Sequence, residues 1–208
     1  MSIKDRKDRE NAQLRQKILN AAMRIFAEQG YGNVSMRKIA AMIDYSPTTI
    51  YRFFRNKEDL LGTIAVETYK NLSARFEKIK QKSNGNPLDL LKSLVKDYIF
   101  FCVEQSDMFR LYSDISSFEM EEGVMYERLG ETRYMVYQSW FSCIRQSIES
   151  GCLEIKDAVR IFLYLWDAVN GYIDHRIKHP LVPRKPLEED SDEFLSLVFR
   201  GIEMKNNI

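Results

Sequence analysis

Apolar residues recur along this chain at helical spacing, and short polar breaks separate the apolar stretches. The first stretch follows the i, i+4 and i+7 spacing of one helix face and comprises Leu14, Ile18, Ala21, Ala22, Ile25 and Phe26. Gly30 follows it and can end the helix in a left-handed conformation. The alternation typical of a half-buried strand is not evident. The pattern predicts an all-α fold of about nine helices.

Capping residues predict two short helices after this first one. Ser35 is a candidate N-cap for a helix over about 36–43, and Ser46 is one for a helix over about 47–53. Pro47 would take the first helical position, where its missing N–H costs nothing. Two short helices that are joined by a tight turn and braced by a longer helix form a helix-turn-helix unit.

The remaining breaks predict longer helices. Asn56 is a candidate cap for a helix to about residue 82, which the sequence SNGNP at 83–87 ends. Further helices are expected from Pro87, from Ser106, and over about 125–149, 156–178 and 191–204. The helix over 156–178 should carry one stripe of Val159, Phe162, Leu163, Trp166, Val169, Asn170 and Ile173. Three prolines in 179–186 predict a stiff linker.

Composition adds little to this picture. The chain has 208 residues, of which 45% are hydrophobic and 29% charged, as in ordinary folded proteins. Its longest wholly apolar runs, such as 98–103, are far shorter than the about 20 residues that a membrane span needs. The charged N-terminus shows no secretion signal. Cys102, Cys143 and Cys152 form no C-x-x-C pair, so we expect reduced thiols and a cytoplasmic protein.

The charge is unevenly distributed. Residues 1–57 carry 12 Lys and Arg against 5 Asp and Glu, whereas residues 58–208 carry 19 against 25. A basic head on an acidic body indicates contact with a polyanion, although a basic face can also be merely solvated. We therefore divide the chain into a head, residues 1–57, with a basic arm and the helix-turn-helix, and a larger helical domain, residues 58–208.

The second short helix has the chemistry of a DNA-reading helix. In a helix-turn-helix unit its N-terminal residues reach base edges in the major groove. Thr48 and Thr49 are small, and their hydroxyl and methyl groups suit base contacts. Tyr51 and Arg52 could hold phosphates, and Lys57 would add charge to the start of the next helix. Singly, each of these residues could equally be a helix start, a core aromatic or a solvated charge.

Residues 14–61 resemble the DNA-binding domain of the TetR family of bacterial transcriptional regulators. The landmarks that carry the resemblance are Phe26-Ala27-Glu28, Gly30-Tyr31, Ile39-Ala40, Ser46, Ile50-Tyr51, Phe54, Lys57-Glu58 and Leu60-Leu61. Two positions depart from the family pattern. Asp44 stands where the family usually has Gly in the turn, and Asp tolerates the left-handed conformation. Phe53 stands where the family often has a His that contacts phosphate, so this contact would be absent.

The resemblance implies which residues touch DNA. Carried over by position, the contacts are Ser35, Arg37, Tyr45, Ser46, Thr48, Thr49, Tyr51, Arg52 and Lys57. An arm with Lys4, Arg6, Lys7 and Arg9 could add flexible contacts to phosphate or the minor groove, or could be disordered and non-specific.

For the larger domain, the resemblance implies effector binding and dimerisation. The segment 165–172 resembles the Trp-x-x-x-His-Gly signature of one subgroup, with Asn170 in place of His. A homodimer through helices 156–178 and 191–204 would match a palindromic DNA operator. A small organic effector is expected near Tyr98, Phe101, Phe109, Tyr112, Tyr134, Tyr137, Trp140 and Trp166. The same aromatic residues could instead be ordinary core residues.

An enzyme is the main competing class. His175 and His179 have the i, i+4 spacing of metal ligands, but the H-E-x-x-H pattern is missing and Pro180 follows at once. Such residues usually complement the helix dipole. With no Gly-rich phosphate loop and no G-x-S-x-G, we predict neither enzymatic activity nor a metal or cofactor. The resemblance to the TetR family implies a repressor that an effector releases from DNA. A ligand-responsive activator, or a helical interaction module that does not read DNA, are the alternatives.

Overall fold

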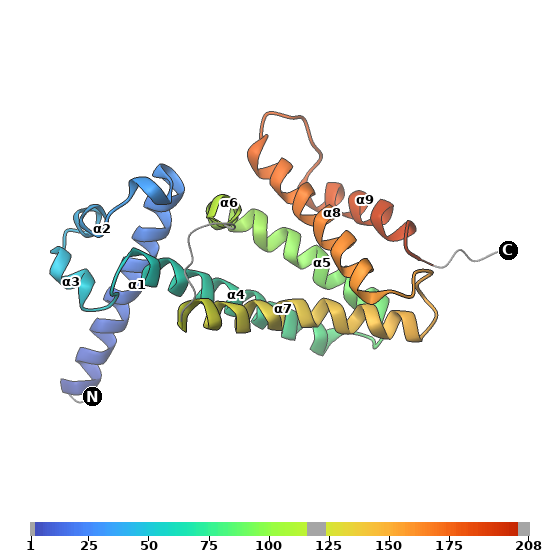
Figure 1. The fold of residues 1–208 in the computed structure, drawn as a ribbon, viewed down its shortest axis with the longest axis horizontal. Coiled ribbons are helices and arrows are strands. Elements are labelled where there is room, and N and C mark those ends of the chain that lie inside the picture. The colour runs from blue at the N-terminus through green and yellow to red at the C-terminus, as the bar shows by residue number, and fades with distance from the viewer. Residues whose placement is uncertain (1–2, 116–123, 204–208) are drawn as a thin grey trace. The chain divides into compact units, whose positions relative to one another are not determined.

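The computed structural model describes the backbone of residues 3–115 and 124–203, with side chains over 4–110 and 130–203. These residues form nine α-helices and one 3-10 helix, Tyr31–Asn33, which confirms the predicted all-α fold (Figure 1). The helices are α1 (Ile3–Gln29), α2 (Met36–Met42), α3 (Pro47–Tyr51), α4 (Lys57–Lys82), α5 (Pro87–Glu104), α6 (Ser106–Ile115), α7 (Val124–Glu149), α8 (Ala158–Lys178) and α9 (Leu187–Arg200). None of the described helices is long and apolar enough to cross a membrane.

Packing divides the chain into two compact units. The head unit comprises Met1–Thr68 and Asp107–Gly130, and the body unit comprises Tyr69–Ser106 and Glu131–Ile208. The border therefore falls within the continuous helix α4, between Thr68 and Tyr69. The functional division at residue 57 stays a prediction.

The head unit is a small helical core. Phe26, Ile39 and Ile50 are fully buried in it, and Phe54 joins them, as the apolar pattern predicts. The helix α2 packs against both α1 and α3, so the two short helices are held by the longer one. This packing positions α3 in the manner of a helix-turn-helix unit.

Side-chain caps begin the helices of the head where the sequence predicts them. The Ser35 hydroxyl accepts a hydrogen bond from the backbone N–H of Lys38 at 3.3 Å, at the start of α2. The Asn56 side chain accepts one from the N–H of Asp59 at 2.7 Å, at the start of α4. Because such caps satisfy N–H groups that lack helical partners, they fix where each helix starts.

The first helix begins earlier than its apolar stripe indicates. The helix α1 starts at Ile3, so the basic residues expected in a flexible arm lie in a helix instead. Their side chains are exposed, and Arg6 forms an i, i+4 ion pair with Glu10 at 3.1 Å. Seven of the ten residues in KDRKDRENAQ are good helix formers and none is Gly or Pro, so the helix extends beyond its apolar stripe.

In the body unit, α5 packs against both α8 and α9. The guanidinium of Arg75 on α4 joins α5 by 2.6 Å contacts to Asp97 and to Glu104. Asp190 of α9 accepts hydrogen bonds at 2.7 Å from Tyr172 and Arg176 of α8. Polar contacts thus reinforce the apolar packing of α4 with α5 and of α8 with α9.

The predicted bounds of three helices differ from the structure, and α9 also ends at Arg200 rather than at about 204. The helix α3 ends at Tyr51 because Phe53 N–H bonds to the carbonyl of Ile50 at 2.9 Å, a tighter turn than the α-helix. The helix α8 begins at Ala158 because Asp157 caps it. The helix α9 begins at Leu187, four residues before the prediction, since Pro186 stands at its N-cap and three acidic residues in its first turn complement its dipole.

The predicted stripe on α8 is also partly wrong. Val159 and Leu163 are 55% and 49% exposed, although the stripe includes them. The buried positions of α8 instead follow one another at intervals of four and are Ile161, Leu165, Val169, Ile173 and Ile177. Both faces of α8 are rich in apolar residues, so periodicity alone did not separate the buried face from the exposed one.

Candidate functional sites

One face of α3 is buried and the other is open. Ile50 points into the head core with no exposed surface, whereas Tyr51 is 54% exposed and Thr48 and Arg52 are also exposed. Among the described residues Thr48 has no hydrogen-bond partner, so its hydroxyl is available to another molecule. The predicted residues therefore form an accessible face, which a second molecule can approach.

The start of α3 is fixed by two hydroxyl groups. The Ser46 hydroxyl accepts a hydrogen bond from the Thr49 N–H at 3.2 Å and lies 3.0 Å from the Thr49 hydroxyl. The cap holds both side chains in one geometry. Ser46 is exposed and Thr49 half-buried, so the same hydroxyl pair stands at the accessible end of the helix.

The turn before α3 contains the residue that departs from the family pattern. Asp44 has φ 61°, a left-handed conformation that the sequence predicts for this position. The N–H of Tyr45 then bonds to the Ala40 carbonyl at 3.0 Å, which closes the end of α2. Tyr45 remains 41% exposed. Asp44 therefore supports the tight turn without a glycine.

Lys17 of α1 supports the same turn, and sequence reasoning missed it. Its ammonium donates to the Ile43 carbonyl at 3.2 Å and lies 5.2 Å from the centre of the Tyr45 ring. A cation at the end of a helix stabilises the exposed carbonyl groups, and the ring face adds a cation–π contact. No sequence signal identifies Lys17, because 26 residues separate it from its carbonyl partner.

Lys57 is engaged inside the head. Its ammonium donates to the Tyr31 carbonyl at 2.9 Å and lies 3.9 Å from the centre of that ring, while the Tyr31 hydroxyl donates to Glu58. The prediction gave Lys57 a contact with phosphate at the start of α4. In this structure its ammonium joins α4 to the segment after α1, and contact with DNA stays a prediction.

The other predicted DNA contacts lie at the start of α2. Ser35, which caps α2, and Arg37 are both exposed. Phe53 is half-buried and packs against the head core, with the Arg52 guanidinium 5.8 Å from its ring centre. Its place in the core agrees with leaving Phe53 out of the site.

In the body unit, six aromatic residues make one connected group, in which Phe141 contacts only Phe162. The other five are here called the aromatic cluster: Tyr98, Tyr137, Trp140, Phe162 and Trp166. Tyr98 of α5 lies 5.4 Å from both tryptophans, measured between ring centres. Tyr137 of α7 lies 4.8 Å from Trp166 of α8, and Trp140 lies 5.8 Å from it. The cluster thus joins three helices. Four of its members are predicted effector residues, and Phe162, which sequence reasoning placed only on the α8 stripe, is the fifth.

Hydrogen bonds hold part of the cluster in place. The Tyr98 hydroxyl donates to the side-chain oxygen of Asn170 at 3.0 Å, and the Asn170 amide donates to the Trp166 carbonyl at 2.8 Å. The indole N–H of Trp140 is buried without a partner among the described residues. Burial raises the pKa of Tyr98 well above its usual value and that of Cys102 to about 12, so both groups keep their protons at neutral pH.

Three other predicted effector residues are not in the cluster. Phe101 is buried elsewhere on α5, under the Arg75 guanidinium, and Tyr134 is 60% exposed. Phe109 belongs to the head unit, where it is half-buried. The side chain of Tyr112 lies outside the described residues. The prediction grouped these aromatic residues by their place in the sequence, and sequence alone does not show which neighbours each side chain contacts.

His175 and His179 do not form a metal site among the described residues, where no group of three potential ligands is found. Their ring centres are 4.6 Å apart, but the Arg184 guanidinium lies 2.6 Å from Nδ1 of His175. A fixed cation at this nitrogen opposes a metal ion there.

Comparison with known proteins shows which family the N-terminal region resembles. Residues 18–64 match the family model described as "Bacterial regulatory proteins, tetR family". The transcriptional regulator UidR of Escherichia coli K12 is 40% identical over 62 residues, which cover 30% of this chain and 32% of UidR. Residues 18–64 therefore form a TetR-family domain. The "Fatty acid metabolism regulator protein" of Bacillus subtilis is 37% identical over 69 residues, 33% of this chain and 36% of that protein.

Solved structures of transcriptional regulators resemble nearly the whole chain in fold. The ketosteroid transcriptional regulator KstR2 of Mycobacterium tuberculosis has a TM-score of 0.76 at 19% identity, over 92% of this chain and 95% of KstR2. FadR from Bacillus subtilis, solved in complex with stearoyl-CoA, has a TM-score of 0.73 at 20% identity, over 90% and 98%. The TM-scores show a common fold, and at identities below 25% they show the fold alone. The sequence matches are shorter, since the chain spans about a third of the length of UidR and the B. subtilis fatty acid regulator.

Proposed function

We propose that this TetR-family protein is a DNA-binding transcriptional regulator, a homodimeric repressor that a small organic effector releases from a palindromic operator. The observation that carries the proposal is the accessible face of α3, where Thr48, Tyr51 and Arg52 are exposed beside a capped helix start. Residues 1–57 have an excess of basic residues, which favours a polyanion as partner. Binding to chromosomal DNA would place the protein in the cytoplasm.

Exposed apolar side chains support a dimer through α8 and α9. On α8 Leu163 is 49% and Tyr164 57% exposed, and on α9 Leu197 is 70% exposed. Apolar residues on two neighbouring helices of each copy suit a two-fold interface, in which the same surface pairs with itself. Two heads related in this way would read two half-sites of a palindrome.

The aromatic cluster supports the effector part of the proposal. It contains a buried N–H donor without a partner among the described residues, and three of its rings are half-buried, so a small molecule can approach it. The stearoyl-CoA bound to FadR does not transfer to this chain. The solved FadR structure is 20% identical to it, and the curated fatty acid regulator matches over 69 residues only.

Selection from a pool of random duplex DNA tests the DNA-reading part. The purified protein should enrich a palindromic sequence, and its affinity for that sequence should fall steeply with salt, since each neutralised phosphate contributes a slope of about −0.9. Failure to enrich any sequence, with weak binding even at low salt, would favour a helical interaction module. Enrichment with activation of a reporter gene would favour a ligand-responsive activator instead.

A further inference from the structure

The Trp140 indole N–H is an unused donor in the body unit. The side chain is 1% exposed, and its Nε1 has no hydrogen-bond partner among the described residues. Buried donors in native proteins are nearly always paired with an acceptor, so an unpaired one indicates either a cost in stability or a missing partner. The donor lies within the aromatic cluster, between Tyr98 and Trp166.

The hydroxyl and amide groups at the cluster already have partners. Tyr98 donates to Asn170, and Asn170 donates to the Trp166 carbonyl. The side chains of Tyr69 and Tyr137 interact with each other. Two indole N–H groups have no partner among the described residues, and that of Trp140 is the fully buried one, since Trp166 is half-buried and can reach water.

The charges near the cluster oppose a cationic ligand. Arg133, Tyr137 and Trp140 follow one another at i, i+4 and i+7 on one face of α7, and the Arg133 guanidinium lies 5.9 Å from the Tyr137 ring centre. Among the described residues no carboxylate forms an ion pair with Arg133. Asp97, on the neighbouring helix α5, is held by Arg75. A cation would meet Arg133 and would leave the Trp140 N–H without an acceptor.

An anionic ligand would lose hydration in the same place. The rings that surround Trp140 are apolar, and transfer of a charge from water into such surroundings is costly unless it is fully paired. Trp140 supplies only one neutral donor, and the Arg133 guanidinium lies beside the half-buried outer ring of Tyr137, whereas Trp140 is buried behind that ring. A neutral acceptor, such as a carbonyl oxygen, fits the donor without this cost.

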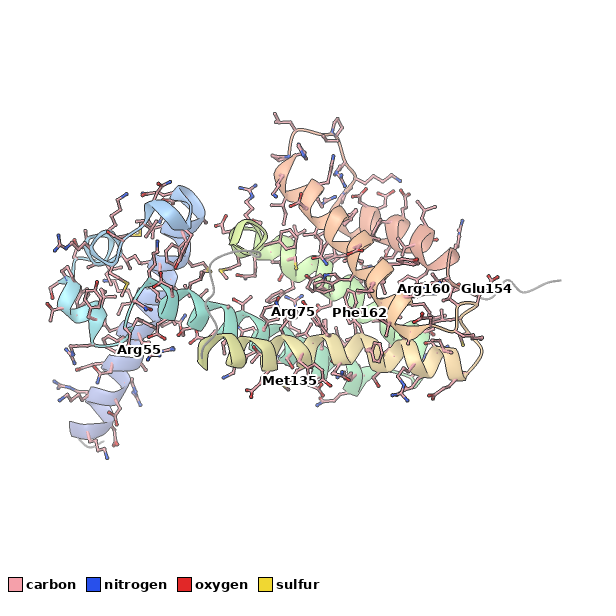
Figure 2. The ribbon with its side chains drawn as sticks, in the orientation of Figure 1. Arg55, Arg75, Met135, Glu154, Arg160 and Phe162 are labelled. Carbon is pink, nitrogen blue, oxygen red and sulfur yellow. The ribbon has the colours of Figure 1, made fainter. Side chains whose placement is uncertain are left out.

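The cluster is also reachable from the surface. Tyr137, Phe162 and Trp166 are half-buried, while Tyr98 and Trp140 are buried behind them. Phe162, labelled in Figure 2, comes from α8 and its ring contacts Tyr137, Trp140 and Trp166. A planar ligand that displaces one of the outer rings would stack on the others and reach the indole N–H.

We propose that the aromatic cluster binds a neutral, planar aromatic molecule whose carbonyl oxygen accepts the hydrogen bond of the Trp140 indole N–H. The role of this molecule as effector rests on the function proposed above, whereas its binding does not depend on DNA. Trp140 and Trp166 are the only two tryptophans of the chain, so binding at the cluster changes the intrinsic fluorescence directly.

A pair of matched probes tests the proposal on the full chain. 9-Fluorenone and fluorene have the same three-ring outline, but only fluorenone carries a carbonyl acceptor. Calorimetric titration should show fluorenone binding about tenfold more tightly than fluorene, the ratio expected for one buried hydrogen bond. Trp140→Phe keeps an aromatic ring but removes the N–H, so this variant should bind the two probes equally. Phe101→Leu, which changes a buried ring of α5 outside the cluster, should keep the tenfold preference.

Several results would overturn the proposal. Equal affinities of the wild-type protein for fluorenone and fluorene would do so without any variant, as would absence of fluorenone binding. Tighter binding of fluorenone-4-carboxylate would indicate an anion site, and tighter binding of the cation proflavine would indicate a cation site. Circular dichroism of Trp140→Phe controls for folding. If fluorenone binds as expected but leaves operator affinity unchanged, the ligand site stands and its regulatory role fails.

Discussion

The head and the body of this protein build their sites in opposite ways. In the head, hydrogen bonds between residues three apart fix the start of α2 and of α3, and the predicted DNA-contacting side chains of α3 point outward. In the body, the aromatic cluster joins α5, α7 and α8, and Tyr98 and Trp166 meet across 68 positions of sequence. A locally determined site can be predicted from sequence, whereas a site made of distant residues depends on packing.

The largest expected difference between the DNA-contacting face and the aromatic cluster comes from removal of one core aromatic ring in each unit. Phe26→Ala in the head and Phe199→Ala in the body each delete a side chain that is 1% exposed. Each should cost about 3–5 kcal/mol of unfolding free energy, measured in urea, because a large cavity remains.

The two variants should differ in which site they lose. Phe26→Ala should weaken operator binding while fluorenone still binds the body, and Phe199→Ala should weaken fluorenone binding first. Loss of both activities in both variants would mean that the units fold as one cooperative block, and the contrast between head and body would then not extend to stability.

Reversal of one charge on α3 should affect DNA alone. Arg52→Glu replaces an exposed cation at the end of α3 by an anion that would face phosphates. Operator affinity should fall about a hundredfold, since like charges at an interface cost several kcal/mol. Fluorescence anisotropy with labelled operator measures the loss. Arg145→Glu makes the same change on an exposed body residue and should leave operator affinity within about twofold, as a charge outside the interface does not touch the DNA.

Alkaline pH should weaken the body through the thiol of Cys102, one of its two buried cysteines. Burial raises the pKa of Cys102 to about 12, whereas an unfolded cysteine has a pKa near 8.5. Below about pH 8.5 the Cys102 thiol is protonated in both the folded and the unfolded state, so its contribution to the free energy of unfolding is fully present. As pH rises, the unfolded thiol ionises first, so the free energy of unfolding falls until the folded thiol also ionises.

Urea unfolding at pH 8 and pH 10 measures this effect. The wild-type protein should lose about 2 kcal/mol more than Cys102→Ala between these pH values, at about 1.4 kcal/mol per pH unit. Cys152→Ala, at a half-buried position, serves as the matched variant and should follow the wild type. An equal loss in all three proteins would assign the alkaline weakening to other groups, such as the buried tyrosines.

The same contrast explains how far sequence reasoning reached. It predicted the caps Ser35, Ser46 and Asn56, because each cap and its N–H partner lie three residues apart. It predicted neither Lys17 under the turn nor the separation of Phe101 from the aromatic cluster, since these depend on which helix faces meet. The spacing of apolar residues predicts which helix face is buried, but it does not predict which side chains of other helices that face contacts.

The turn at Asp44 offers the finest test of local determination. Asp44 has φ 61°, where glycine has no steric cost and a β-branched side chain is strained. Asp44→Gly should therefore change the unfolding free energy by less than about 1 kcal/mol, and Asp44→Val should lower it by about 1–2 kcal/mol. Both values come from urea unfolding of the full chain.

DNA binding should follow the same order as stability in these variants. Asp44→Val would shift Tyr45 and the start of α3, so operator affinity should fall, while fluorenone binding in the body stays unchanged. Asp44→Asn is the matched control, because Asn also tolerates the left-handed region and should behave like the wild type. If Asp44→Val bound operator as tightly as Asp44→Asn, the turn would not set the position of α3, and the packing of Ile50 in the head core would have to do so alone.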